Sequence, residues 1–153
     1  MKKILTLTLF FSGIIFPAII SPVRAQCKAK AIVKKCKGDL SPFMYDAFVL
    51  TEIYYKPEKQ IVEVEFTAMS GEDYKLVFCT SELHKPIGIS IYDKPKTNKK
   101  RKVLYFDENS KDGYLCTFKP EKTGTYYIEY AVPSDVTIGK PKSGCVVMLI
   151  GLK

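Results

Sequence analysis

The residues of this chain with the greatest capacity for chemistry are its five cysteines and its single histidine. The cysteines are Cys27, Cys36, Cys79, Cys116 and Cys145. None of their spacings is the short C-x-x-C pair that a structural zinc site normally uses. Because five thiols cannot all pair within one chain, at least one must stay free or bridge to another molecule. The sequence therefore predicts disulfide chemistry, no metal centre and no cofactor.

The histidine, His84, is the only imidazole available for acid–base catalysis. It lies in a polar segment, 81–86, and no nucleophile-elbow pattern marks a serine elsewhere in the chain. A Ser-His-acid arrangement around His84 would make the protein a small secreted hydrolase, and this stays an alternative. The pattern favours an exposed loop histidine, so we expect a protein that is not an enzyme.

A lysine-rich run at 94–102 is the strongest local concentration of charge. Its candidate anion-binding residues are Lys96, Lys99, Lys100, Arg101 and Lys102. One alternative function is therefore contact with an anionic partner such as an acidic polysaccharide. The favoured interpretation is a solvated hairpin loop whose charge also discourages edge association. No aromatic residue interrupts the run, which does not favour stacking on nucleic acid.

The turn at 107–113 concentrates oxygen-bearing side chains, as a calcium loop does. The order differs from the helix-loop-helix pattern, because Lys111 stands at the fifth position and Phe118 at the twelfth, where a bidentate glutamate is needed. We expect a polar turn at this position.

Residues 1–25 have the pattern of an export signal. Lys2 and Lys3 precede a short apolar stretch, and Val23-Arg24-Ala25 places small residues at the two positions that a signal peptidase reads. Cleavage would leave a mature chain that begins at Gln26. Export to an oxidising compartment would favour pairing of the cysteines.

Two other fates of this segment compete with cleavage. A membrane span needs about 20 apolar residues, and the stretch at 4–20 is shorter and contains Gly13 and Pro17. A lipid anchor on Cys27 would place Gln26 where the lipobox normally has a small residue. We therefore expect no transmembrane anchor after cleavage, and a final location in the periplasm, on the outer surface or in the medium.

The mature chain, 26–153, has the size of one domain. Cleavage removes three basic residues and no acidic one, so the formal net charge falls from +8 to +5. No second domain, repeat or long linker is visible in the sequence, and its apolar content is sufficient for a hydrophobic core.

The mature chain should begin with one helix and continue as β-structure. The segment 26–37 predicts a short basic helix that stops at Gly38. The remainder alternates apolar and polar residues between turns. The expected strands are 47–55, 60–69, 73–79, 88–93, 102–106, 114–118, 124–131 and 145–153. Eight strands in one exported domain predict a jelly-roll-like, two-sheet antiparallel β-sandwich, with the helix covering the apolar last strand.

The expected elements give each cysteine a role. Cys27 and Cys36 are nine residues apart, about 13.5 Å along a helix, whereas disulfide Cα atoms lie within about 7 Å. We expect them to pair with Cys79 and Cys145, in an order that the sequence leaves open, and Cys116 to be a buried free thiol. If the segment is a coil, Cys27 and Cys36 can instead close a small loop.

Several segments together resemble the bacterial pre-peptidase C-terminal domain, and in general layout the GOLD domain. These are Gly71-Glu-Asp-Tyr-Lys-Leu, Ile89-Ser-Ile-Tyr-Asp and Lys122-Thr-Gly-Thr-Tyr-Tyr-Ile-Glu-Tyr130, within 47–153. The resemblance implies a non-catalytic accessory or binding module, although this chain has no peptidase domain. Its general character also resembles small exported proteins of Gram-negative bacteria. We therefore expect an exported binding or envelope-assembly module, whose partner is an envelope protein or an anionic glycan.

Overall fold

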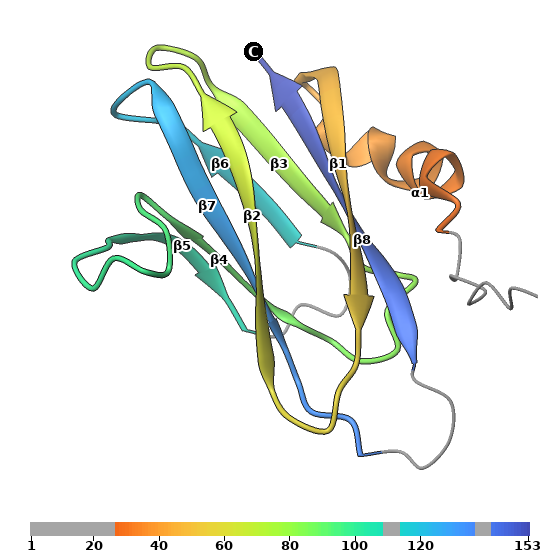
Figure 1. The fold of residues 1–153 in the computed structure, drawn as a ribbon. Helices are drawn as coiled ribbons and strands as arrows, with labels where there is room; N and C mark the ends of the chain where they lie inside the picture. Colours follow the sequence, from red (N-terminus) through yellow and green to blue (C-terminus); the bar gives the residue numbers. More distant parts are fainter. Residues whose placement is uncertain (1–26, 109–113, 137–141) are drawn as a thin grey trace, which may run out of the picture.

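Two antiparallel sheets face each other in this protein. The structure, a computed structural model, describes residues 27–108, 114–136 and 142–153, and in these ranges it contains eight strands and one short α-helix (Figure 1). The strands are β1 Met44–Tyr54, β2 Gln60–Ala68, β3 Tyr74–Cys79, β4 Gly88–Tyr92, β5 Val103–Asp107, β6 Tyr114–Phe118, β7 Gly124–Val132 and β8 Ser143–Leu152. The prediction of a mainly β, two-sheet sandwich is confirmed.

The strand order is that of a jelly roll. Sheet A has the order β1-β8-β3-β6 and sheet B the order β2-β7-β4-β5, and every pairing is antiparallel. The chain crosses between the sheets after most strands, so neighbours within a sheet are distant in sequence. Each sheet is therefore held together mainly by contacts between segments that are far apart in sequence.

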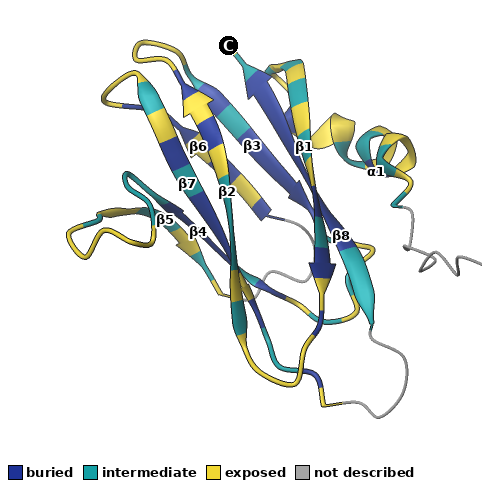
Figure 2. Cartoon of the chain, in the orientation of Figure 1, coloured by how far each residue is buried: buried dark blue, intermediate teal, exposed yellow. Residues whose placement is uncertain are grey.

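The core lies between the sheets because the strands alternate. In β2, Phe66 is buried while its neighbour Glu65 is exposed, and the same period of two runs through β6 and β7 (Figure 2). Phe66, Phe118 and Tyr126 form an edge-to-face aromatic cluster, with 4.8 Å between the centroids of the last two. This alternation is the pattern that the sequence predicted for a half-buried strand.

A helical segment covers the outer face of sheet A. Helix α1, Ala29–Cys36, continues into a 3₁₀ turn, η1, Lys37–Leu40. Ile32 and Leu40 are buried in a second apolar cluster with Val147 of β8. Because β8 is covered on both faces, it can be apolar along nearly its whole length. The predicted cover of the last strand is confirmed.

The helix differs from its predicted bounds of 26–37. Gln26 lies outside the described residues, and the α-helix begins at Ala29 and ends at Cys36. Gly38 does not end it, since it lies inside the 3₁₀ turn. The tighter turn brings Leu40, which is 1 % exposed, onto the same apolar cluster as Ile32. Helix α1 is too short to cross a membrane, and no other helix in the described ranges could do so.

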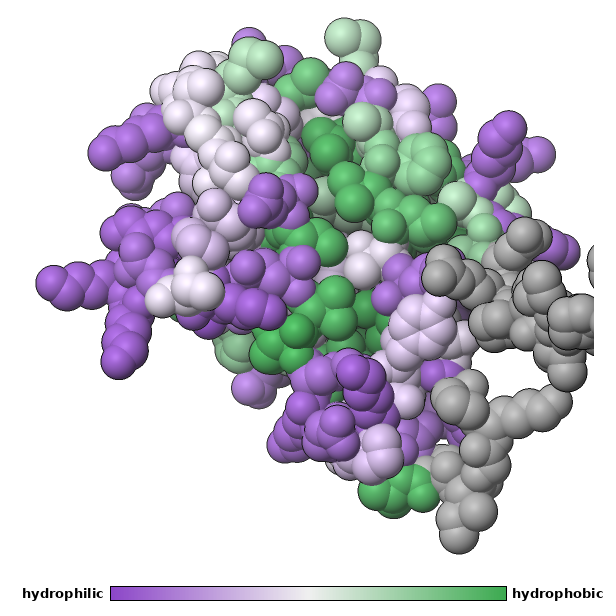
Figure 3. All heavy atoms as spheres, in the orientation of Figure 1, coloured by the Kyte–Doolittle hydropathy of each residue, from purple (hydrophilic) through white to green (hydrophobic). Residues whose placement is uncertain are grey.

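The sandwich has two sides where edge strands of opposite sheets come together. Strands β1 and β2 border one side, and β5 and β6 border the other. On the β1–β2 side, Val49 and Val62 pack against the core but stay partly exposed. Figure 3 shows apolar side chains between the two sheets in the view of Figure 1. The β5–β6 side has a different character, because a cavity opens there.

Candidate functional site

The four predicted disulfide cysteines join the helical segment to sheet A. Cys27 pairs with Cys145 of β8, and Cys36 pairs with Cys79 of β3, at Cα–Cα distances of 6.1 and 6.3 Å. The expectation that these cysteines tie the helix to the sandwich is confirmed, and the alternative of a Cys27–Cys36 loop is wrong. Because β8 and β3 are adjacent strands, the two bridges fix both ends of α1 over one pair of strands.

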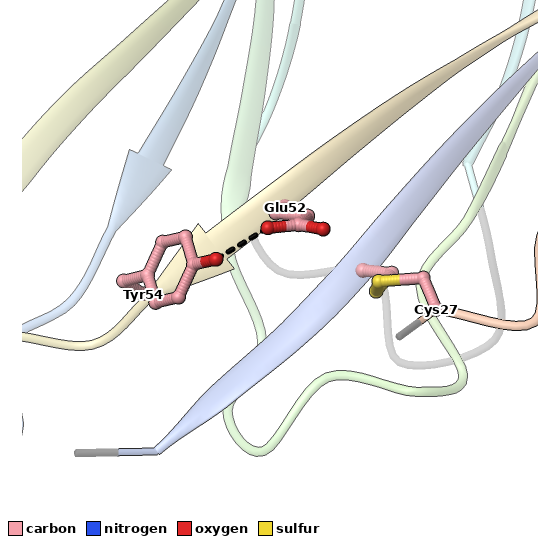
Figure 4. The surroundings of a disulfide bond; sticks show 4 residues. Cys27, Glu52 and Tyr54 are labelled. Carbon is pink, nitrogen blue, oxygen red and sulfur yellow. Dashed lines mark hydrogen bonds between the residues drawn. A yellow bond between two sulfur atoms is a disulfide. The ribbon is translucent and has the colours of Figure 1, made fainter. Parts of the chain in front are cut away.

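The surroundings of the first bridge place it on the outer face of sheet A. Glu52 of β1 lies opposite Cys145 in the strand register. Figure 4 shows Cys27 near Glu52, whose carboxylate accepts a hydrogen bond from the Tyr54 hydroxyl. The bridge therefore lies beside a polar, partly exposed stretch of β1 and outside the aromatic core between the sheets.

Cys116 has the predicted position of a buried free thiol. It lies on β6 with 5 % of its surface exposed and takes part in no disulfide. Burial raises the pKa of the Cys116 thiol to about 11. The thiol is therefore protonated at neutral pH, and a nucleophilic role does not suit it.

The basic run forms the β4–β5 loop, and its arginine is bound to sheet B. The Arg101 guanidinium donates to both carboxylate oxygens of Glu129 at 2.5 and 3.3 Å. It also lies 4.0 Å from Glu63 and 3.8 Å from the centre of the Tyr92 ring. The hydrogen bonds to Glu129 are the main cause of the raised pKa of Arg101. Arg101 is therefore a structural contact of the loop with the sheet.

The predicted lysines of the loop divide into two groups. Lys96, Lys99 and Lys100 are exposed, and the backbone amide of Lys96 donates to Glu63 at 2.7 Å. Lys102 lies at the base of the loop, where its amide donates to Asp93 at 2.6 Å and its ammonium lies 3.7 Å from Glu121. The five candidate residues thus differ in their contacts, because Arg101 is held on sheet B whereas the side chain of Lys102 is exposed and its ammonium makes an exposed ion pair.

His84 is part of a polar cluster at the end of the sandwich where the β1–β2 turn lies. Its Nε2 atom is 2.7 Å from the Lys142 ammonium and 3.5 Å from Asp135. Asp135 is buried and also pairs with Lys85 at 3.2 Å. The Tyr55 ring meets the imidazole edge-on. Among the described residues, the polar and ring contacts of His84 are thus with a lysine, an aspartate and a tyrosine.

A cavity of about 530 Å³ lies between the edge strands β5 and β6, closed at one end by the β6–β7 turn. Its inner wall is apolar and aromatic. This wall is formed by Leu104, Tyr105, Cys116, Phe118 and Tyr126. Burial raises the pKa of Tyr105 to about 12, with Asp107 adding to the shift, so its phenol stays neutral. The volume lies within the range of pockets that hold small molecules.

The rim of the cavity is mostly cationic. Four lysines and two carboxylates line it, which leaves two positive charges in excess: Lys94, Lys102, Lys119 and Lys122 against Asp93 and Glu121. The pairs that Lys102 and Lys119 make with Glu121 and Asp73 are exposed. Exposed pairs are weak, so the lysines can exchange these partners for another anion.

Sequence reasoning did not find this cavity. Leu104 and Tyr105 are adjacent in sequence, and strict alternation would send one of them outward. The β4–β5 register shifts between Ile91 and Tyr92, so both side chains reach the interior. The basic run is the one sequence feature that lies near the cavity, because its first and last lysines, Lys94 and Lys102, line the cavity mouth.

The described residues provide no group of three or more His, Cys, Asp and Glu side chains that could hold a metal ion. Of the turn at 107–113, residues 109–113 lie outside the described part of the chain, as does the predicted export signal at 1–25.

Comparisons with known proteins assign no family. No family model matches the chain, and no curated protein matches it. Among solved structures, a chain in the structure of infectious bursal disease virus Gt strain is similar over 72 % of this chain and 31 % of that one, with 14 % identity and a TM-score of 0.39. This chain thus spans about a third of the viral chain. A likeness this weak supports no functional argument.

Proposed function

We propose that this protein is an exported, non-catalytic binding module whose ligand occupies the cavity between β5 and β6. The cavity itself is the observation that carries the proposal, because an apolar recess with a few polar groups at its mouth is the usual form of a small-molecule site. Two disulfides in a small domain are compatible with an oxidising, extracytoplasmic location. The resemblance to pre-peptidase C-terminal domains, which stays a prediction, also favours binding.

The chemistry of the cavity wall supports binding without catalysis. Two groups on this wall, the Cys116 thiol and the Tyr105 phenol, have raised pKa values that keep them protonated at neutral pH. General acid–base catalysis works best with groups that titrate near the working pH. His84, the single histidine of the sequence, does not line the cavity.

A variant that fills the cavity tests this proposal. In Leu104→Trp the larger side chain occupies the recess, whereas Val103→Trp places the same side chain on the neighbouring residue, which is 50 % exposed and does not line the cavity. The molecule that co-purifies with the wild-type protein from its own compartment is identified by mass spectrometry. It should be lost from the Leu104→Trp protein and kept by Val103→Trp. Equal retention by both variants would place the binding site elsewhere.

A second candidate is contact with an anionic glycan of the envelope through the exposed part of the β4–β5 loop. The observation that favours it is the exposure of Lys96, Lys99 and Lys100 around the loop tip. Retention on an immobilised acidic polysaccharide should fall with added salt and fall further in Lys99→Gln/Lys100→Gln. Retention that is independent of salt and of these lysines would remove this candidate.

A further inference from the structure

We infer that the ligand of the β5–β6 cavity is an amphipathic anion, with an apolar body on the aromatic wall and a carboxylate or phosphate head among the rim lysines. This inference rests on the proposed function, since it names the class of molecule that the same cavity binds. Two independent features of the lining support it, one for each end of the ligand.

The inner wall selects the apolar body. Phe118 and Tyr126 contact each other edge-to-face, and the Tyr126 hydroxyl donates to the Lys122 carbonyl at 2.7 Å, so this polar group is already satisfied. Leu104 adds an aliphatic surface, and Cys116 adds a neutral thiol. A polar ligand would lose its hydration on this wall and regain few hydrogen bonds, whereas an acyl chain or an aromatic ring gains free energy from burial.

The rim selects the charge of the head. Lys94 and Lys102 come from the base of the β4–β5 loop, and Lys119 and Lys122 from the β6–β7 turn, so cations stand on both sides of the mouth. Lys122 has no ion pair among the described residues. An anion at this position gains from the excess of two positive charges, while a cation would be repelled and a neutral head would gain nothing.

Three matched probes separate these two contributions. Octanoate has both the apolar body and the charge, octan-1-ol has only the body, and acetate has only the charge. Calorimetric titration of the disulfide-bonded protein should show the tightest binding for octanoate, binding at least about fivefold weaker for octan-1-ol, and no saturable binding of acetate. Octyl phosphate, added as a fourth probe, shows which anionic head the rim prefers.

The lysines are tested with two charge-matched variants. Lys102→Gln/Lys122→Gln removes two rim cations, while Lys99→Gln/Lys100→Gln removes two cations near the loop tip, outside the cavity. Both change the net charge equally. The rim variant should raise the Kd for octanoate about tenfold and leave that for octan-1-ol within about twofold. The loop variant should change neither Kd by more than about twofold, because these charges are screened.

Occupancy of the cavity is read from the native thiol. Because Cys116 lines the cavity and takes part in no disulfide, its reaction with iodoacetamide should slow at least about fivefold when octanoate is saturating, and acetate should not slow it. The same protection should be absent in Leu104→Trp, which leaves no room for the probe.

The results separate failure of the ligand class from failure of the binding site. If octan-1-ol binds as tightly as octanoate, or if neither octanoate nor octyl phosphate binds at millimolar concentration, the amphipathic anion is refuted. The binding module itself stands as long as Leu104→Trp alone loses the co-purified molecule. If the rim variant and the loop variant weaken octanoate equally, the anion binds on the loop and the inference is also refuted.

Discussion

Arg101 offers the sharpest test of how the basic loop is used. It lies over the outer face of sheet B, where Glu63 and Glu129 are directly opposite each other on β2 and β7. Like charges in that position destabilise a sheet unless a cation lies between them. The side chain of Glu129 is only 7 % exposed, so it depends on Arg101 for a partner. Replacing Arg101 should therefore destabilise the whole sandwich.

The size of the effect follows from the contacts that are lost. Arg101→Leu removes two hydrogen bonds to a charged, buried carboxylate, together worth about 2 kcal/mol once the partial exposure of the arginine is allowed for. The contact with the Tyr92 ring adds about 0.5 to 1 kcal/mol. We expect a loss of about 3 kcal/mol in the free energy of unfolding, which corresponds to a fall in Tm of about 10 °C.

Urea unfolding of a double-mutant cycle isolates the pair. The cycle compares wild type, Arg101→Leu, Glu129→Gln and the double variant, and should give a coupling free energy of about 2 kcal/mol. This coupling should persist in 0.5 M salt because the pair is mostly buried. Lys100→Gln, near the exposed tip of the same loop, is the control and should stay within about 0.5 kcal/mol of wild type.

The opposite outcome would mean that the Arg101 side chain is free to bind an anion. A loss of less than about 0.5 kcal/mol in Arg101→Leu, or a coupling that disappears in salt, would mean that the guanidinium is not held on the sheet in solution. The loop would then be a single cationic surface, as the run of lysines suggests.

Three further predictions concern the core and the bridges. Because the pKa of Cys116 is about 11, its alkylation rate should keep rising up to about pH 10. The alkylation rate of a free peptide thiol levels off above about pH 9. A plateau for Cys116 at that lower pH would contradict its burial. Gly144→Ala should lower the free energy of unfolding by about 2 kcal/mol, because the new Cβ would lie 2.6 Å from a backbone oxygen of the β3–β4 loop. The control Gly124→Ala adds a Cβ in open space and should stay within about 0.5 kcal/mol of wild type. Equal unfolding midpoints for the two variants would refute this prediction. Serine at both Cys36 and Cys79 removes the bridge and should lower the free energy of unfolding, measured with denaturant, by about 4 kcal/mol, as expected for a sequence separation of 43 residues. A loss below about 1 kcal/mol would show that the bridge does not constrain the unfolded chain.

The parts of the fold that the sequence predicted are those that depend on local pattern. Strands β2 and β7 alternate so regularly that their buried faces could be assigned residue by residue, and their pairing places Val64 opposite Ile128. Distance argued against a bridge between Cys27 and Cys36 only on condition that the segment is helical, and the observed helix α1 removes the coil alternative. Their partners could not be assigned, because Cys79 and Cys145 become neighbours only through the jelly-roll order, which inserts β8 between β1 and β3.

The cavity could not be predicted from the sequence, because it too depends on contacts between distant segments. It exists because β5 and β6 are the edge strands of different sheets, and because a register shift turns both Leu104 and Tyr105 inward. Neither the choice of edge strand nor the position of a bulge follows from hydrophobic periodicity. The reach of Arg101 to Glu129, which is 28 residues away in sequence, is equally non-local.

These non-local contacts give the basic run two separate roles. Arg101 binds the outer face of sheet B, and this contact holds the base of the loop at the edge of the sandwich. Lys94 and Lys102 are thereby placed at the mouth of the cavity, on the side opposite the β6–β7 turn. If this coupling is correct, Arg101→Leu should weaken octanoate binding as well as stability, although Arg101 does not line the cavity. The lysine cluster would then be a ligand-recognition element only because its arginine is structural.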